Sequence, residues 1–353
     1  MPTQKLEIKL SFIEGLRDIV LRETRRSLGV TAREGGEDSL YIDCPDILAP
    51  VKGLGSVARA YLVARDRRYN PLYVSNHKSI IGQTIETILS AEPSESFKTF
   101  KVTCAGSGSS EARGIAAYIE ETYRLVEAEE ADLKVHIIKL GECWEVGAQI
   151  TPRPLSLRAY KVRNMSGAMD PTIAYAMNSL CGLERVDSYL NVFSGSGTLL
   201  VEAGLRYPNI GRLVGFDNDK KHVSLAIQNV KEAGLIKRVS LREADILEEP
   251  DLGTFDVIAS DLPFGMSISK GEDLGALYRC FVEYCEGALG AGGVLAVYTS
   301  EHHILEELLK KSNFQILKTI DLRFVTSVDA YLRPRIFLCG LRNGLGREGV
   351  YTK

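Results

Sequence analysis

The second half of the chain alternates short apolar runs with amphipathic segments of helical length, and this alternation restricts the possible fold more than any other feature. A helix beginning at Asp170-Pro171 and ending near Cys181-Gly182 comes first, with proline in the first helical turn. The elements expected after it are strands 187–193, 211–217, 238–243, 255–260, 293–299, 314–324 and 330–340, and helices 198–206, 219–233, 273–289 and 302–311. Such alternation predicts a doubly wound α/β domain with a mostly parallel sheet. The last two strands are expected to form an antiparallel hairpin at its edge.

The first 150 residues have shorter elements that suggest two small α+β units. The first unit is expected to contain strands 5–12, 39–43 and 58–64 and helices 15–29, 46–52 and 78–89. The polar stretch 91–96 has the composition of a linker. The second unit is expected to contain strands 97–104, 133–140 and 143–150 and a helix over 109–125. We therefore predict an α+β domain (1–92), a binding module (93–152), a linker with a lead-in helix (153–186) and the α/β domain (187–353).

The run Ser260-Asp261-Leu262-Pro263-Phe264-Gly265 follows the fourth strand of the α/β domain. Ligands bind at the carboxyl ends of strands in such sheets, so this run is a candidate reaction site. Asp261 and the Leu262 carbonyl offer two acceptors for an NH2 group, Pro263 restricts the backbone and Phe264 can stack on a flat ring. The alternative interpretation is structural: Asp261 caps the next helix, Phe264 is core and Pro263 ends the strand.

The loop after the first strand is rich in glycine and serine. It reads Asn191-Val192-Phe193-Ser194-Gly195-Ser196-Gly197-Thr198, and its glycines allow a ligand to approach the backbone. A dinucleotide fingerprint would place a third glycine where Leu200 stands, and no phosphate-binding loop with Gly-Lys is present. The pattern therefore disfavours a pyrophosphate ligand.

Two further acidic positions follow the second and third strands. Asp217, followed by Asn218, can accept both hydroxyls of a ribose, and Asp245, followed by Ile246, can meet an adenine amino group. Each aspartate alone is better explained by helix capping. Together with 191–198 and 260–265, they describe a nucleoside site without a pyrophosphate, which fits S-adenosylmethionine best.

Composition excludes several classes of protein. No run of eighteen apolar residues occurs and the first residues do not form a signal peptide, so we predict a cytoplasmic protein without membrane contact. The seven cysteines form no CxxC pair and the five histidines have no ligand spacing, which argues against disulfides and against a metal.

The net charge of −3 supplies no general attraction to nucleic acid, so RNA contacts would depend on local clusters. The candidate RNA-binding residues are Arg65, Arg67, Arg68, Lys78, Arg153, Arg158 and Lys161. The alternative is that each cluster is a solvated face.

Several of these motifs resemble those of a known protein family. Residues 187–340 resemble a class I S-adenosylmethionine-dependent methyltransferase, and Asp261-Leu262-Pro263-Phe264 resembles the (N/D)-(P/L)-P-(Y/F) motif of enzymes that methylate exocyclic amines of bases. Residues 97–163 resemble a THUMP domain and residues 5–90 the ferredoxin-like domain that precedes it in RNA-modifying proteins. With leucine at position 262, the motif resembles that of the tRNA guanine-N2 methyltransferases that act on the acceptor stem. The glycine-rich loop differs from the family pattern, with Asn191 in place of an acid and Ser194 in place of a cysteine.

The resemblance implies an α/β, Rossmann-like methyltransferase domain with a mostly parallel seven-stranded sheet, preceded by ferredoxin-like and THUMP domains. It implies transfer of a methyl group from S-adenosylmethionine to N2 of a guanine in tRNA, most specifically guanine 6 of the acceptor stem, by a protein that we expect to be a monomer. Asp261, Leu262, Pro263 and Phe264 would form the catalytic site. The alternatives are guanine methylation at another tRNA position or in rRNA, methylation of a DNA base, and a silent RNA-binding protein that retains the fold. A nicotinamide dehydrogenase is disfavoured by Leu200.

Overall fold

The computed structural model describes residues 5–43, 48–91, 96–104, 110–264, 273–327 and 330–344. The chain divides into two compact units, one made of Met1–Phe12 and Arg17–Ser156 and the other of Ile13–Leu16 and Leu157–Lys353. The sequence predictions that fall outside the described residues include most of the linker at 91–96, the start of the helix at 46–52, and Gly265 of the candidate catalytic run.

The first unit contains one mixed sheet of eight strands, ordered β2-β3-β1-β4-β8-β7-β5-β6. The strands are β1 (Leu6–Ser11), β2 (Ala32–Gly36), β3 (Ser39–Ile42), β4 (Arg59–Asp66), β5 (Thr99–Cys104), β6 (Val126–Glu127), β7 (Leu133–Leu140) and β8 (Cys143–Gln149). The helices are α1 (Arg17–Leu28), α2 (Leu48–Val51), α3 (Gln83–Ala91) and α4 (Ser110–Tyr123), with short turns η2 (Val74–Asn76) and η3 (Lys78–Gly82) before α3. The predicted α+β character is confirmed.

Strands from both predicted N-terminal domains share this sheet. β4 pairs antiparallel with β8, from Tyr61 opposite Gln149 to Asp66 opposite Trp144. The division of the unit near residue 92 stays a prediction. The sequence analysis missed β2, because Ala32–Gly36 is mostly exposed and has no apolar alternation.

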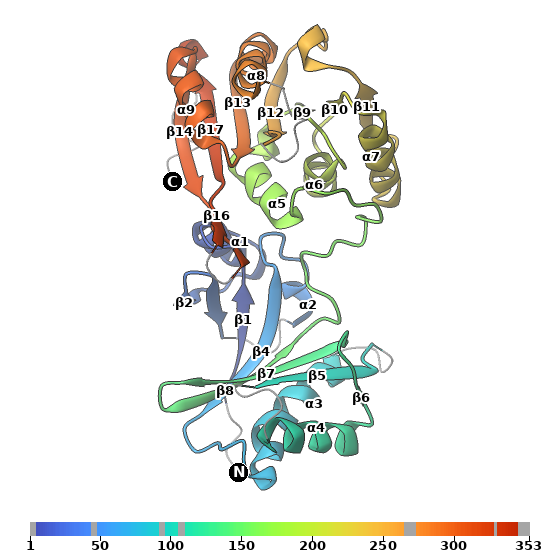
Figure 1. Cartoon of the computed structure of the whole chain (residues 1–353), viewed down its shortest axis with the longest axis vertical. Helices are drawn as coiled ribbons and strands as arrows, with labels where there is room; N and C mark the ends of the chain where they lie inside the picture. The colour runs from blue at the N-terminus through green and yellow to red at the C-terminus, as the bar shows by residue number, and fades with distance from the viewer. Residues whose placement is uncertain are drawn as a thin grey trace. The chain divides into compact units, whose positions relative to one another are not determined.

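The second unit is built on a sheet of seven strands in the order β11-β10-β9-β12-β13-β17-β14 (Figure 1). The strands are β9 (Ser188–Val192), β10 (Arg212–Asp217), β11 (Val239–Glu243), β12 (Phe255–Asp261), β13 (Leu289–Thr299), β14 (Phe314–Asp321) and β17 (Arg335–Leu341). The helices are α5 (Pro171–Leu180), α6 (Thr198–Arg206), α7 (Lys220–Glu232), α8 (Leu274–Ala288) and α9 (His302–Lys311), with short turns η4 (Leu183–Arg185), η5 (Ile246–Glu248) and η6 (Arg342–Gly344). Strands β9 to β13 pair in parallel, so the predicted mostly parallel α/β sheet is confirmed.

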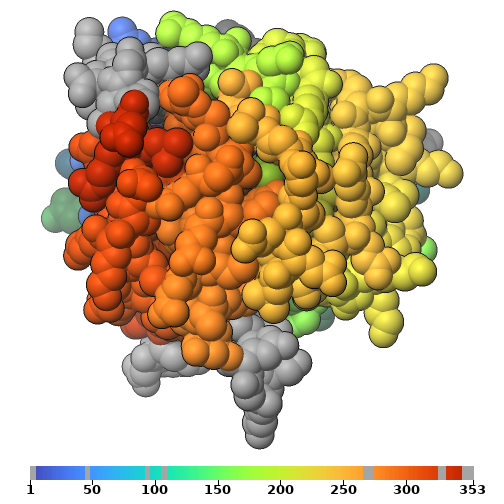
Figure 2. Space-filling view, turned by 90° about the horizontal axis from the view of Figure 1, so that it is seen from above, coloured from blue at the N-terminus to red at the C-terminus, as the bar shows by residue number. Residues whose placement is uncertain are grey.

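The two faces of this sheet are covered by different helices. Leu190 and Val192 of β9 belong to the core cluster that includes buried residues of α8 and α9. Tyr189 directly precedes Leu190 in the strand, so its side chain points to the opposite face, and its hydroxyl donates a 2.7 Å hydrogen bond to Asn178 Oδ1 of α5. The space-filling view of Figure 2 shows yellow segments on one side of this unit, orange segments in the middle and red segments on the other side.

The end of the sheet differs in detail from the prediction. β17 pairs antiparallel with β14, as expected, but β17 lies between β13 and β14, so β14 is the edge strand. The connection also holds a separate hairpin, β15 (Phe324–Ser327) and β16 (Ala330–Leu332), so the predicted strands 314–324 and 330–340 are each interrupted. Pro334, which has no backbone N–H, separates β16 from β17.

The strand order reverses between β9 and β12: β10, which follows β9 in the chain, lies on one side of β9, and β12 lies on the other side. Such a reversal opens a crevice at the carboxyl ends of the two strands. No helix of the described residues is long and apolar enough to span a bilayer.

Candidate active site

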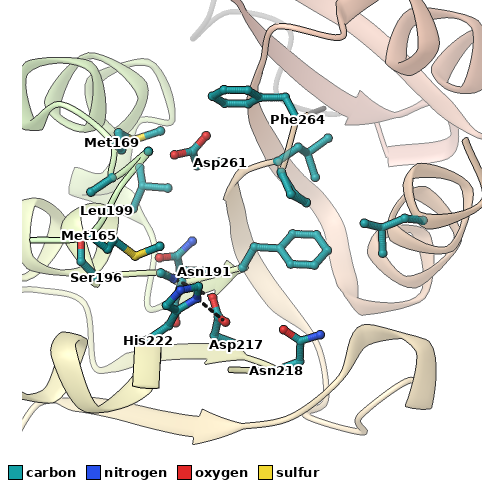
Figure 3. A pocket seen from close by; sticks show the side chains of 18 of the residues that line it. Met165, Met169, Asn191, Ser196, Leu199, Asp217, Asn218, His222, Asp261 and Phe264 are labelled. Carbon is teal, nitrogen blue, oxygen red and sulfur yellow. Dashed lines mark hydrogen bonds and ion pairs between the residues drawn. The ribbon is translucent and has the colours of Figure 1, made fainter. Parts of the chain in front are cut away.

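A cavity of about 650 Å³ lies at the carboxyl ends of β9, β10 and β12 (Figure 3). Its wall includes four segments predicted from the sequence, namely the glycine-rich loop, Asp217-Asn218, Asp245 and Asp261-Leu262-Pro263-Phe264. Figure 3 shows Asp261 and Met169 toward one end of the cavity and Asp217 and His222 toward the other. The structure therefore brings the predicted cofactor and catalytic loops to one site, although Gly197 and Ile246 are not among the lining residues.

The glycine-rich loop folds over the end of the neighbouring strand. Phe193, Gly195 and Gly197 have positive φ angles of 53°, 51° and 79°. The Ser194 N–H donates to the Phe216 carbonyl at 2.9 Å, and the Gly195 N–H donates to Asp217 Oδ2 at 2.8 Å. These bonds hold the loop in the left-handed conformation that glycine favours at 195 and 197.

Asp217 is buried at the end of β10 and holds several groups at once. Besides Gly195, its Oδ1 accepts hydrogen bonds from the Asp219 N–H and from His222 Nδ1, each at 3.1 Å. It does not cap α7, because the capping side chain is that of Asp219. Its predicted contact with a ribose would use the lone pairs that these bonds leave, and stays a prediction.

Asp245 caps a helical turn and also lines the cavity. Its Oδ1 accepts from the Leu247 N–H at 3.0 Å, as the structural interpretation expected. Its Oδ2 lies 3.5 Å from Asn218 Nδ2, so the side chain joins two loops of the wall. Capping is compatible with a ligand contact here, since capping uses Oδ1 and leaves lone pairs on Oδ2.

The candidate catalytic run, Asp261–Phe264, is held by hydrogen bonds to the backbone of Leu262 and Pro263. The Leu262 N–H donates to the Tyr298 carbonyl at 3.0 Å, and the Leu262 side chain is fully buried. The Pro263 carbonyl accepts from the Tyr278 hydroxyl at 2.9 Å. The structure therefore fixes the backbone on which Asp261 and Phe264 line the cavity.

Three buried polar atoms on the cavity wall have no hydrogen-bond partner among the described residues: Asn191 Oδ1, Ser194 Oγ and Asp261 Oδ1. Buried polar atoms are nearly always paired, so the three point to a polar ligand in the cavity. Asn191 Nδ2 is already held by the carbonyls of Ala259, at 3.0 Å, and Val192, at 3.1 Å, which leaves the amide oxygen to accept from a ligand. Burial raises the pKa of Asp261 to about 8, while the nearby charge of Lys161 lowers it.

Several residues of the site were not predicted from the sequence. Met165 and Met169 belong to the segment before α5 and line the cavity, and a Cβ at Gly195 would lie 3.6 Å from Met165 Sδ. Nothing in their pattern indicated a site. His222 was detectable in principle, because it lies five residues after Asp217 in the first turns of the next helix.

The seven candidate RNA-binding residues have different environments. Arg67, Arg68, Lys78 and Arg153 are exposed. Arg65 lies 2.7 Å from the fully buried Glu145. Burial alone would raise the pKa of Glu145, but hydrogen bonds and charges from His136, Lys9 and Arg65 outweigh burial and lower this pKa to about 2. Arg158 contacts buried Glu202 at 2.9 Å, and Lys161 Nζ donates to the Met169 carbonyl at 2.6 Å. RNA contact by any of the seven stays a prediction.

Residues 158–327 match the family model described as UPF0020: RMKL-like, methyltransferase domain. The match begins at Arg158, so it includes the segment with Met165 and Met169 as well as every strand of the seven-stranded sheet except β17.

Curated relatives match about half of this chain. A U6 snRNA (guanine-N(2))-methyltransferase, THUMPD2 of Bos taurus, is 31% identical over 47% of this chain and 32% of its own length. A tRNA (guanine(10)-N2)-dimethyltransferase of Methanothermobacter thermautotrophicus is 30% identical over 47% of this chain and 48% of its own. A tRNA (guanine(6)-N2)-methyltransferase of Thermus thermophilus is 29% identical over 50% of this chain and 52% of its own. The chain thus spans about half or less of the length of these relatives.

The fold extends over both units in a solved structure. The crystal structure of TrmN from Thermus thermophilus has a TM-score of 0.74 with 22% identity, over 95% of this chain and 99% of that one. This similarity supports the fold of the whole chain, including the mixed sheet of the first unit.

Proposed function

Residues 158–327 match the model of the RMKL-like methyltransferase domain family, and from this match we propose that the protein transfers a methyl group from S-adenosylmethionine to N2 of a guanine in RNA. The observation that carries the proposal is the catalytic run. Asp261 presents a buried, unpartnered carboxylate oxygen to the cavity, beside the fixed backbone of Leu262 and the ring of Phe264. Acceptors beside an aromatic ring suit an aminated base.

The residues at the cavity fit S-adenosylmethionine. The unpartnered oxygens of Asn191 and Ser194 can accept from its amino group, and the absence of a side chain at Gly195 lets a ligand approach the backbone. Asp217, Asn218 and Asp245 at the far end suit a ribose and an aminated ring. When bound, this cofactor supplies a methyl group on a positively charged sulfur.

The chain's own residues act on the guanine. The guanine amine is a weak nucleophile, because its lone pair is delocalised into the ring. Asp261 and the Leu262 carbonyl would accept its two N–H bonds and hold the nitrogen in line for attack, while Phe264 stacks on the base. Catalysis would then depend mainly on positioning and electrostatics in a buried site.

We place the substrate in tRNA, at guanine 6 of the acceptor stem. Leu262 between Asp261 and Pro263 resembles that branch of the family, and the relative named for guanine 6 is 29% identical. A paired guanine must be flipped out of the stem at a cost of about a few kcal/mol, which RNA binding has to supply. The exposed Arg67, Arg68, Lys78 and Arg153 of the first unit are candidate phosphate contacts.

A second candidate substrate is U6 snRNA, favoured by the relative at 31% identity. Guanine 10 of tRNA is a third, since the relative named for that position is 30% identical. All three share the guanine-N2 chemistry proposed for Asp261.

The test is transfer of labelled methyl from S-adenosylmethionine to unmodified tRNA, rRNA and U6 snRNA transcripts in separate reactions, followed by nucleoside analysis. We expect N2-methylguanosine in tRNA, lost when guanine 6 is replaced by adenine. Label confined to rRNA or U6 snRNA would overturn the tRNA assignment. Absence of label from all three, with the cofactor bound, would overturn the guanine-N2 proposal itself.

A further inference from the structure

The carboxylate of Asp217 has less free acceptor capacity than the sequence suggested. Both hydroxyls of a ribose were expected to donate to it. In the structure its Oδ2 accepts from the Gly195 N–H at 2.8 Å, and its Oδ1 accepts from the Asp219 N–H and from His222 Nδ1, each at 3.1 Å. A carboxylate offers roughly four lone pairs, so these bonds leave about one for a ligand. A ribose bound here needs a second acceptor for its other hydroxyl.

His222 lies beside this carboxylate on the wall of the cavity (Figure 3). It belongs to the first turn of α7, which Asp219 caps by accepting from the Lys221 N–H at 2.7 Å. The His222 side chain is 32% exposed, so one part of the ring packs against the protein and another can meet a ligand. Because a carboxylate only accepts, the bond to Asp217 requires the proton of the neutral ring to lie on Nδ1.

The second ring nitrogen of His222 is then an acceptor. In a neutral imidazole with its proton on Nδ1, the lone pair is on Nε2. Nε2 lies 3.7 Å from Asp219 Oδ2, which is too far for a hydrogen bond. The contact with Asp217 therefore fixes both the orientation of the ring and the nitrogen that can accept from a hydroxyl.

We propose that His222 is a cofactor-binding residue, which accepts one ribose hydroxyl of S-adenosylmethionine at Nε2 while Asp217 accepts the other. The two hydroxyls are on neighbouring carbons, so their acceptors must lie side by side, as His222 and Asp217 do. The inference concerns the cofactor alone, so it does not depend on which base of which RNA is methylated.

Asn218 is the competing acceptor at this end of the cavity. Its Nδ2 lies 3.5 Å from Asp245 Oδ2, so its side chain extends toward the loop that was expected to meet the adenine ring. His222, in contrast, contacts the Asp217 carboxylate directly. This difference in contacts favours His222 as the second acceptor for the ribose.

The test is calorimetric binding of S-adenosylhomocysteine, and of its 2′-deoxy and 3′-deoxy analogues, to the full chain without RNA. S-adenosylhomocysteine has no methyl group to transfer, and each analogue lacks one ribose hydroxyl. We expect the wild type to bind each analogue about fivefold more weakly than the parent compound, because each hydroxyl makes one hydrogen bond.

Three variants separate the two nitrogens of His222. His222→Asn keeps an N–H for Asp217 but has no acceptor at the place of Nε2, and His222→Phe removes both groups. We expect both variants to bind the parent compound about fivefold more weakly, and to bind one of the two deoxy analogues as tightly as the parent. The other analogue should still lose about fivefold in His222→Asn, because Asp217 stays in place. His222→Gln, whose amide oxygen can reach the place of Nε2, should regain part of the lost affinity.

His303→Asn is the matched control. His303 is an exposed histidine in the first turn of α9 and is not among the residues that line the cavity, so all three affinities should stay unchanged. If both analogues lose the same factor in His222→Asn as in the wild type, Nε2 contacts neither hydroxyl and the inference is wrong. If one analogue matches the parent compound in Asn218→Ala instead, the second acceptor is Asn218, which also overturns the inference.

The experiment distinguishes this inference from the proposed function, because it contains no RNA and no methyl transfer. A wild type that methylates no guanine but shows the expected pattern in the His222 variants would overturn the guanine chemistry and support the inference. Failure of the wild type to bind S-adenosylhomocysteine would overturn the inference together with the choice of cofactor.

Discussion

The Tyr278 hydroxyl donates a 2.9 Å hydrogen bond to the carbonyl of Pro263 and lies 2.7 Å from Thr299 Oγ1. Tyr278 belongs to α8 and Thr299 ends β13, so a helix and a neighbouring strand together hold the candidate catalytic run. The Thr299 hydroxyl also accepts from the Glu301 N–H at 3.0 Å, which fixes the loop into α9. The backbone that presents Asp261 and Phe264 is therefore supported by fully buried side chains rather than by the loop alone.

Replacing Tyr278 by phenylalanine should lower the rate of methyl transfer about tenfold, because the Pro263 carbonyl loses its donor and the run loses its alignment. The free energy of unfolding should fall by about 1 kcal/mol. Tyr284→Phe is the matched control, since Tyr284 on the same helix donates to the Pro250 carbonyl at 3.1 Å, outside the catalytic run. Equal losses of activity in the two variants would contradict the role given to Tyr278.

Asp261→Asn should stabilise the cofactor-free protein at high pH. The pKa of Asp261 in the folded protein, about 8, lies above the ordinary value of 3.8, so folding favours the protonated form. The protonated Asp261 therefore contributes fully to the free energy of unfolding below pH 4, and this contribution is lost as the pH rises toward and through 8. Asparagine cannot ionise, so Tm of the variant should exceed that of the wild type by about 5 °C or more at pH 9 and match it at pH 4.

Thermal unfolding followed by circular dichroism at the two pH values measures this difference. Asp251→Asn, at an exposed aspartate of the same unit, is the control and should shift Tm by the same amount at pH 4 and at pH 9. A Tm difference for Asp261→Asn that does not grow with pH would show that the carboxylate is not buried as described.

Replacing Arg67 and Arg68 together by alanine should weaken RNA binding and reduce the salt slope of log Kd by up to about two, because each exposed arginine can neutralise one phosphate. Arg65 is left intact, since it contacts buried Glu145. Arg22→Ala with Arg25→Ala, at two exposed arginines of α1, removes the same charge elsewhere on the first unit. RNA binding is measured between 50 and 200 mM salt. If the affinity falls equally in both double variants, Arg67 and Arg68 have no specific role in RNA binding.

The order of elements in the second unit and the loops of its site were predictable from the sequence, for physical reasons. Parallel strands buried on both faces leave continuous apolar runs such as Val257–Ala259, and each run ends where a ligand loop begins. Asp217, Asp245 and Asp261 were therefore located by position alone, and all three line one cavity.

What could not be predicted are contacts between residues distant in the chain. Lys161 was grouped with basic neighbours, because sequence shows its charge but not the Met169 carbonyl that holds it. Arg65 was grouped with Arg67 and Arg68, although its side chain stacks on Tyr41, with the guanidinium carbon 4.1 Å from the ring centre. Alternation along the strand does not distinguish an arginine facing solvent from one paired with a buried carboxylate.

The most direct test of the account is a single turnover of methyl transfer by the wild type and by Asp261→Ala, with S-adenosylmethionine and the RNA substrate saturating. If Asp261 holds the reacting amine, the rate should fall at least about 100-fold in the variant. The dissociation constants of cofactor and RNA should stay within about threefold of the wild-type values, because neither ligand depends on this carboxylate alone. A variant that binds both ligands and turns over at a rate near that of the wild type would contradict the role of Asp261 in methyl transfer.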